Sequence, residues 1–214
     1  MQQIFSTQTT PEEYEKQGIN YSFPKAPSRC PQPDCKMPIK LKKHGFYSRH
    51  YIKAGFCKKI LIRRYLCPYC GKTISFLPHF CIPHFQYCGE LIVRYIYSTI
   101  ARDSPLNICL AILRKVFIDI CIERQHVYYY NKRVCKNLVH IQHGLRQIYP
   151  NVSLPSGDLE KRKKAIEIFD IIEERYTSIH IFNENFFTQV QKSFLAPCIN
   201  NFSINNEKNE AFFI

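Results

Sequence analysis

The chain has 214 residues, and 45% of them are apolar, which is enough to build the core of one domain or of two small ones. Lys and Arg number 30 against 17 Asp and Glu, so the net charge of +13 favours a polyanionic partner, either nucleic acid or an anionic membrane surface. The most apolar window, residues 106–122, is interrupted by Asn107, Arg114, Lys115 and Asp119, which excludes a membrane-spanning helix and argues against a membrane partner.

Residues 1–27 mix Gln, Thr, Glu and Pro in no sustained period, so they predict an extended lead-in. The first six residues have neither the basic nor the apolar region of a secretory signal. We therefore expect a cytoplasmic protein.

Residues 28–80 predict a small antiparallel β-unit. Gly45 and Gly55 fall where strand-forming runs break, so turns are expected at or near these glycines. The runs themselves are residues 39–42, 46–52, 59–65 and 73–77.

Two cysteine pairs flank this β-unit. Because cysteines of a cytoplasmic chain stay reduced, paired spacings indicate metal sites before disulfides. The run Cys67-Pro68-Tyr69-Cys70, followed by Gly71, has the form of a knuckle that presents two thiolates. The upstream pair has a wider spacing that structural zinc sites still allow. The predicted ligands of one structural zinc ion are Cys30, Cys35, Cys67 and Cys70.

Other uses of the cysteines have weaker sequence support. The spacing of Cys67 and Cys70 also occurs in redox sites, but no βαβ pattern surrounds it. A catalytic zinc would need a neighbouring acid, and no Asp or Glu occurs in residues 36–89, so no catalytic residue is assigned. Packing among apolar residues is predicted for Cys109, Cys121 and Cys135. Other residues of ligand type compete for a metal but do not follow the paired spacing of a metal site. They are Cys57, Cys81, Cys88, His44, His50, His79 and His84.

The acid-free segment also concentrates positive charge. Its Lys and Arg side chains are expected to hold phosphates, which position a protein on DNA without reading sequence. The predicted phosphate-binding residues are Lys42, Lys43, Arg49, Lys58, Lys59, Arg63, Arg64 and Lys72.

Residues 85–150 predict a helical domain. Apolar residues recur at helical spacing from Leu91 to Ile100, and Ser104 with Pro105 begins a second helix. A third helical segment, about 123–149, is either one long helix or two, and it follows the second helix after a short break. This arrangement fits a helix-turn-helix.

Two interpretations of the third segment stay open, a DNA reader and the solvated face of a helical bundle. In a DNA reader, base edges would be contacted by Arg124, Gln125 and His126. Phosphates would be contacted by Tyr128, Lys132, Arg133 and Lys136.

Residues 151–214 predict an amphipathic helix over 159–175, a short helix near 184–192 and disorder after about residue 200. The helix over 159–175 is a candidate dimer or partner surface. Its acidic residues have basic neighbours, so they indicate a solvated face and not a catalytic site. These acids and the one before them are Asp158, Glu160, Glu167, Asp170, Glu173 and Glu174.

The run 63-RRYLCPYCGKTIS-75, preceded by Lys43-His44-Gly45-Phe46-Tyr47, resembles the zinc ribbon at the start of insertion-sequence transposases and their DNA-binding accessory proteins. Leu77-Pro78-His79-Phe80 and the Arg124-Gln125-His126 helix are similar to positions in small bacterial mobile-element proteins. The resemblance covers roughly residues 28–150. It implies recognition of transposon-end DNA, with the strand chemistry done by an acidic triad that this chain does not supply.

We therefore expect an α+β protein, with an N-terminal zinc ribbon, a helix-turn-helix domain and a helical, partly disordered tail. The expected function is zinc-dependent binding of double-stranded DNA at the nucleoid, by an accessory or truncated, non-catalytic relative of transposases. Its partners would be DNA and either a second copy or a catalytic transposase. The alternatives are a host transcriptional regulator, a metal-dependent nuclease or recombinase, and an RNA-binding protein whose aromatics stack on bases.

Overall fold

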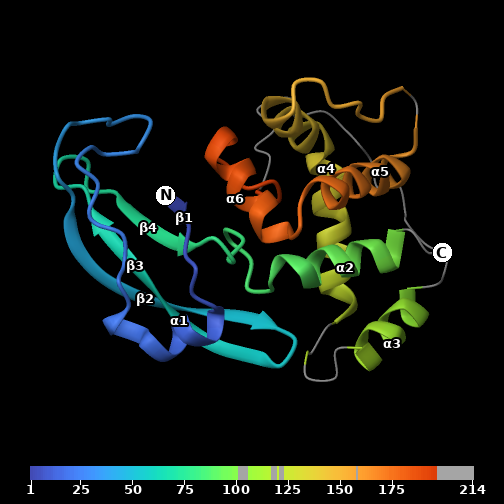
Figure 1. The fold of residues 1–214 in the computed structure, drawn as a ribbon, viewed down its shortest axis with the longest axis horizontal. Helices are drawn as coiled ribbons and strands as arrows, with labels where there is room; N and C mark the ends of the chain where they lie inside the picture. Colours follow the sequence, from blue (N-terminus) through green and yellow to red (C-terminus); the bar gives the residue numbers. More distant parts are fainter. Residues whose placement is uncertain (101–105, 117–119, 121–122, 158, 197–214) are drawn as a thin grey trace.

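The computed structural model describes residues 1–100, 106–116, 120, 123–157 and 159–196. A twisted sheet forms one side of the molecule and a group of helices forms the other (Figure 1). The fold is mixed α+β, as predicted.

The sheet has four strands in the order β1-β4-β3-β2. They are β1 (Gln2–Phe5), β2 (Lys42–Lys53), β3 (Phe56–Leu66) and β4 (Thr73–Pro78). The pairs β2–β3 and β3–β4 are antiparallel, whereas β1 is parallel to β4. Gly55 lies in the β2–β3 turn with φ of +70°, as predicted.

The prediction of a turn at Gly45 is wrong. Gly45 lies inside β2, where the register with β3 shifts between Lys43 and Phe46. Its φ of +74° accommodates the resulting bulge, so the glycine bends a continuous strand instead of ending it.

The prediction of an extended lead-in at residues 1–27 is also wrong. This segment contributes β1, the helix α1 (Pro11–Gln17) and the 3₁₀ helix η1 (Gly18–Asn20). Thr10 and Glu13 form a capping box at the start of α1. Because Tyr14 is the only buried residue of this short helix, the sequence carries no apolar period that would reveal it.

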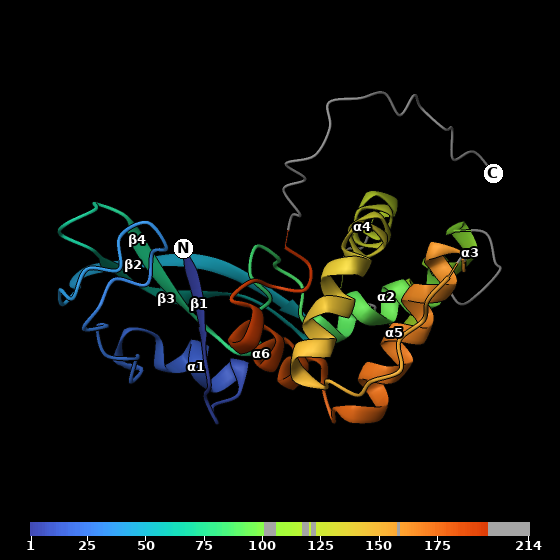
Figure 2. The same cartoon turned by 90° about the horizontal axis from the view of Figure 1, so that it is seen from above.

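In the part of the chain that the structure describes, the helical side contains five helices, and each helix predicted from the sequence has a counterpart among them. They are α2 (Gly89–Ile100), α3 (Leu106–Val116), α4 (Arg124–Ile148), α5 (Lys161–Arg175) and α6 (Ile179–Val190). The segment after residue 123 is one long helix. The last helix begins earlier than predicted, with the Ser178 side chain accepting from the backbone N–H of Ile181. Figure 2 shows α4 rising beside α2, α5 and α6.

One hydrophobic core joins the two sides. It runs from Ile60 and Ile62 in the sheet, through Phe80, into the buried faces of α2, α4, α5 and α6. Gly144 of α4 lets Phe186 of α6 approach closely, because a Cβ there would lie 2.1 Å from the ring. The ranges 28–80 and 85–150 are therefore packed as parts of one body.

A second, smaller core lies at the far end of the sheet. It contains Leu41, Tyr65, Ile74 and Phe76 together with buried cysteines. Among the helices of the described residues, none combines the length and apolar character needed to cross a membrane. The tail after residue 196, for which disorder was predicted from about residue 200, lies outside the described residues.

Candidate metal centre and basic surface

Four cysteines from two distant segments meet at the end of the sheet. The Sγ atoms of Cys30, Cys35, Cys67 and Cys70 all lie within 4.8 Å of one another. The Sγ atoms of Cys30 and Cys70 are 3.9 Å apart, and those of Cys35 and Cys67 are 4.0 Å apart. The structure thus brings together the four predicted ligands.

The spacing of these sulfurs fits a tetrahedral metal ion. With a zinc–sulfur bond of about 2.3 Å, the sulfurs of a regular tetrahedron lie about 3.8 Å apart. The Cys30–Cys70 and Cys35–Cys67 distances are within 0.2 Å of that value, and the other four are at most 4.8 Å. The four sulfurs therefore lie close to the arrangement that such an ion requires.

The second cysteine pair forms a tight knuckle. The backbone N–H of Gly71 donates to the carbonyl of Cys67 at 3.0 Å, and Gly71 has a φ of +68° that turns the chain back toward β4. The backbone N–H groups of Cys70 and Tyr69 also donate to the sulfur of Cys67. These bonds, that of Cys70 foremost, lower the pKa of the Cys67 thiol to about 7.

The first pair makes a similar turn from a wider spacing. The backbone N–H groups of Cys35 and Lys36 both donate to the carbonyl of Gln32, at 3.0 and 3.1 Å. Gln32 thus takes the turn position that Cys67 takes in the other knuckle, and Cys30 supplies its sulfur from two residues upstream. Lys36 adopts a φ of +49°, a left-handed conformation that Gly71 provides at the matching place. The wider spacing therefore still gives a knuckle.

Contacts around the sulfurs close the site. Cys30 and Cys67 are almost fully buried, and burial raises the pKa of the Cys30 thiol. Lys72, predicted to contact phosphate, forms an ion pair with Asp34 at 3.2 Å that links the two knuckles. Within the described residues these cysteines are the single group of three or more potential ligands that converge.

Several predicted phosphate contacts of the sheet are exposed. Lys42, Lys43, Lys58 and Lys59 project to solvent from β2 and β3. Arg64 is half-buried, with its guanidinium 5.9 Å from the Tyr47 ring.

Arg49 and Arg63 are corrections to the predicted phosphate contacts, because both point inward. Arg49 is 9% exposed and donates to the backbone carbonyls of Ile82 and Phe85. Arg63 is also 9% exposed, and its guanidinium lies 4.6 Å from the Phe46 ring centroid. Both guanidinium groups therefore contact other parts of the protein instead of the solvent.

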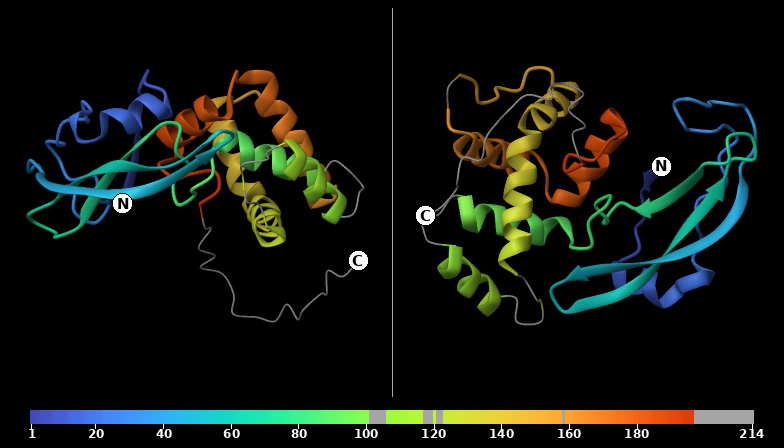
Figure 3. Two further views of the ribbon diagram at one scale, coloured as in Figure 1. Left: turned by 90° about the horizontal axis from the view of Figure 1, so that it is seen from below. Right: turned by 180° about the vertical axis from the view of Figure 1, so that it is seen from behind.

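Helix α4 carries a continuous exposed face. Seen from behind, α4 crosses in front of α2 (Figure 3, right). Its 25 residues include no Asp or Glu, and its buried residues, among them Val127, Val134 and Ile141, face the core. Most of the exposed residues recur at steps of three and four, which places them on one face. Those in this series are Gln125, Tyr128, Lys132, Lys136, Val139, His143 and Arg146, and Arg124, Tyr129 and Gln147 are exposed beside them.

The predicted reader residues divide at the start of α4. Arg124 and Gln125 are exposed. His126 is a correction, because its Nδ1 accepts from the backbone N–H of Glu123 at 3.1 Å and its ring packs 5.5 Å from Tyr87. His126 therefore fixes the start of the helix instead of facing a base.

Tyrosines order the cations on the next turn of α4. Arg133 donates to the hydroxyl of Tyr129 at 2.8 Å, and Lys132 lies 5.6 Å from the Tyr128 ring centroid. The exposed face of α4 continues beyond Lys136, the last residue assigned to it from the sequence, through Val139, His143 and Arg146. The same three- and four-residue steps, extended along an acid-free helix, were the signal that could have found them.

A family model matches residues 30–109, and its description is "Domain of unknown function (DUF6431)". The matched segment holds both cysteine pairs, the strands β2 to β4, the helix α2 and the beginning of α3. No curated protein and no solved structure matches this chain.

Proposed function

We propose that this protein binds double-stranded DNA through the exposed face of α4 and the lysines of β2 and β3, and that a structural zinc ion holds the sheet in place. The observation that carries the proposal is α4 itself, a 25-residue helix without an acidic residue and with one cationic side uncovered. Such a helix is about 37 Å long. Its diameter, about 10–12 Å with side chains, matches the width of a DNA major groove, about 12 Å.

The division of labour on α4 follows from exposure. Arg124 and Gln125 lie at the exposed N-terminal end, where a recognition helix contacts base edges. Lys132, Lys136 and Arg146 continue along the same side and would hold phosphates. In this proposal α3 and α4 are the two helices of a helix-turn-helix, although most of the segment between them lies outside the described residues.

The zinc requirement follows from the position of two lysines. Lys42 pairs with Leu66 and Lys43 pairs with Tyr65, so both lysines lie opposite the end of β3 that leads directly into Cys67. Cys30, Cys35, Cys67 and Cys70 would hold the metal as a zinc ribbon, and the metal would supply the cross-link that this small core lacks. Loss of the metal would then displace the lysines as well.

The biological setting that we propose is that of an accessory, non-catalytic DNA-binding protein of mobile-element origin. It rests on the resemblance of the segment 63–75 to transposase ribbons. Terminal inverted repeats beside the gene would favour this setting over a host transcriptional regulator. The apolar face of α5, considered as a partner surface, is buried by its own chain at Ile168, Phe169 and Ile172, so a partner would need to use another face.

A salt titration of duplex binding tests the proposal. Each phosphate contact releases counterions, so the logarithm of the affinity should fall linearly with the logarithm of the salt concentration, with a slope of about −0.9 per contact. A random duplex pool and a single-stranded RNA pool serve as competitors. An affinity that does not change between 50 and 200 mM salt, or a preference for the RNA, would overturn the proposal.

A further inference from the structure

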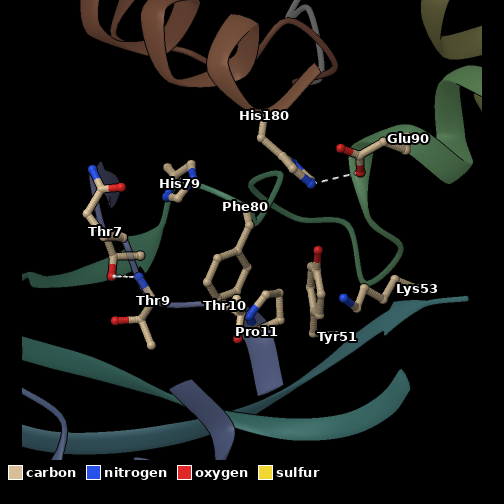
Figure 4. Close-up of a pocket in the computed structure, with 11 residues that line it drawn as sticks. Thr7, Thr9, Thr10, Pro11, Tyr51, Lys53, His79, Phe80, Glu90 and His180 are labelled. Carbon is tan, nitrogen blue, oxygen red and sulfur yellow. Dashed lines mark hydrogen bonds and ion pairs between the residues drawn. The ribbon is translucent and has the colours of Figure 1, made fainter. Parts of the chain in front are cut away.

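A polar pocket lies where the two sides of the molecule meet, away from the cysteines and from the exposed face of α4. It has a volume of about 430 Å³. Figure 4 shows side chains from the segment between β1 and α1, the end of β2, the segment after β4 and the starts of α2 and α6 converging on it. Five segments distant in the sequence thus supply its walls.

The charged groups of this pocket are paired with one another. His180 Nε2 lies 2.7 Å from a carboxylate oxygen of Glu90, and Lys53 Nζ lies 2.7 Å from a carboxylate oxygen of Glu12. Burial acts to raise the pKa of Glu90, but the hydrogen bond and electrostatic attraction of His180, together with weaker hydrogen bonds from the backbone and Cys88, outweigh it and the pKa is lowered. Because Lys53 and Glu90 each have a partner, the pocket offers no unpaired charge that would favour a phosphate or a cation.

Three polar atoms in the same pocket are buried without a hydrogen-bond partner among the described residues. They are the hydroxyl of Tyr51, Nδ1 of His79 and Nδ1 of His180. Tyr51 is 1% exposed, and Figure 4 shows its hydroxyl directed toward the His180–Glu90 pair. Buried polar atoms are nearly always paired in folded proteins, so three unpaired ones in one pocket indicate a hydrogen-bonding ligand.

Aromatic rings form the other walls. Phe80 lies between Tyr51 and His79, with ring centroids 5.1 Å and 5.8 Å away. Burial lowers the pKa of His79, so its ring is neutral at pH 7 and offers one donor and one acceptor. Because Phe80 and Tyr51 are only 2% and 1% exposed, the half-buried ring of His79 is the flat surface that a ligand can meet, together with both donors and acceptors.

We propose that this pocket binds a nucleobase, an uncharged planar ring with donors and acceptors along its edge. A nucleobase uses these features, because it can stack on the ring of His79 and form hydrogen bonds with the unpaired polar atoms. The base can come from a free nucleoside or from an unpaired nucleotide of a strand. The site is distinct from the basic surface of α4, so either proposal can fail without the other.

Calorimetric titration of the zinc-loaded full chain with each of the four deoxynucleosides tests the site. We expect one nucleoside to bind with a stoichiometry of one. Tyr51→Phe removes only the hydroxyl and should weaken that binding about tenfold, the loss of one hydrogen bond. His79→Phe keeps a ring, removes the nitrogens and should weaken it similarly. No heat from any nucleoside at millimolar concentration would overturn the proposal.

Tyr176→Phe is the matched control, since Tyr176 is a buried tyrosine whose hydroxyl also lacks a partner among the described residues but which does not line this pocket. It should leave nucleoside affinity unchanged, and an equal loss in Tyr176→Phe and Tyr51→Phe would contradict the assignment. Duplexes with and without one unpaired base distinguish the two sources. A second zinc equivalent that disappears in His79→Phe would show a metal site instead and overturn the proposal.

Discussion

The Sγ atoms of Cys30 and Cys70 lie 3.9 Å apart, although 40 residues separate them in the sequence. Between them the chain runs out and back through β2 and β3, so the two ends of this excursion close on one point. A tetrahedral metal bound there would connect both knuckles to the sheet. The stability of that end of the protein should therefore depend on the metal.

Replacing Cys67 by Ser should abolish stoichiometric zinc binding and unfold the end of the sheet. Structural zinc contributes about 10–16 kcal/mol in small metal-dependent folds, far more than the small core around Leu41 and Ile74 can replace. Metal analysis and thermal unfolding measure the two effects. Cys57→Ser is the control, because Cys57 is exposed on β3 and outside the cluster. One zinc per chain retained in Cys67→Ser would contradict the assignment.

Replacing Lys132 and Lys136 together by Gln should weaken DNA binding for every sequence and reduce the salt slope by about two. Both side chains are exposed on α4, so stability should not change. Gel-shift titrations at several salt concentrations measure the slope. An unchanged slope would remove α4 from the interface.

Replacing Arg49 by Met should destabilise the fold by about 3 kcal/mol without lowering the salt slope. The guanidinium donates to the carbonyls of Ile82 and Phe85, which would remain buried and unpaired. Urea unfolding measures the loss, and Lys58→Met, an exposed change on β3, is the comparison. A fully stable Arg49→Met with weaker DNA binding would restore Arg49 to the phosphate-binding surface.

Replacing Gly144 by Ala should destabilise the protein by about 1–3 kcal/mol, the usual cost of overpacking. In an unconstrained helix the same change would stabilise by about 1 kcal/mol. The added methyl group meets the ring of Phe186, so combining it with Phe186→Leu should recover part of the loss. Urea unfolding of the single and double variants decides, and a stabilised Gly144→Ala would mean that α4 and α6 are less closely packed.

The protein should lose stability as the pH falls below about 6.5, the ordinary pKa of histidine. Burial lowers the pKa of His140 in the folded protein, so the unfolded chain takes up the proton first. The stabilisation is present above pH 6.5 and is lost as the pH falls through the folded pKa. His140→Gln should reduce the fall in the free energy of unfolding between pH 7.5 and 5.5 by at most about 1.4 kcal/mol per pH unit, and the part that remains is expected from His79, whose pKa is also lowered by burial. His143→Gln, an exposed change on the same helix, should not.

The cysteine site could be predicted because its information is local. Each knuckle contains its own turn residues, and two knuckles around one β-unit leave a single arrangement of four sulfurs. The long helices were equally visible, because their apolar residues recur along the chain. The absence of Asp and Glu from α4 can also be read directly from the sequence.

Other features of the structure depend on contacts between residues far apart in the sequence, which no local sequence pattern reveals. Arg49 and Lys58 look alike in the sequence, and only the carbonyls of Ile82 and Phe85 turn Arg49 inward. The strand β1 pairs with β4 from more than 70 residues away, so nothing near Gln2 announces it. The pocket around Tyr51 escaped prediction for the same reason, because five separate segments create it.

The main hydrophobic core extends beyond both ends of the segment that the family model matches. The family match ends at residue 109, before α4, and it begins after β1 and α1. A fragment cut at those limits would expose Ile60, Ile62 and the inner face of α2 to water, since Tyr14 and the buried side of α4 complete their surroundings. The matched segment alone therefore lacks the elements that enclose its own core.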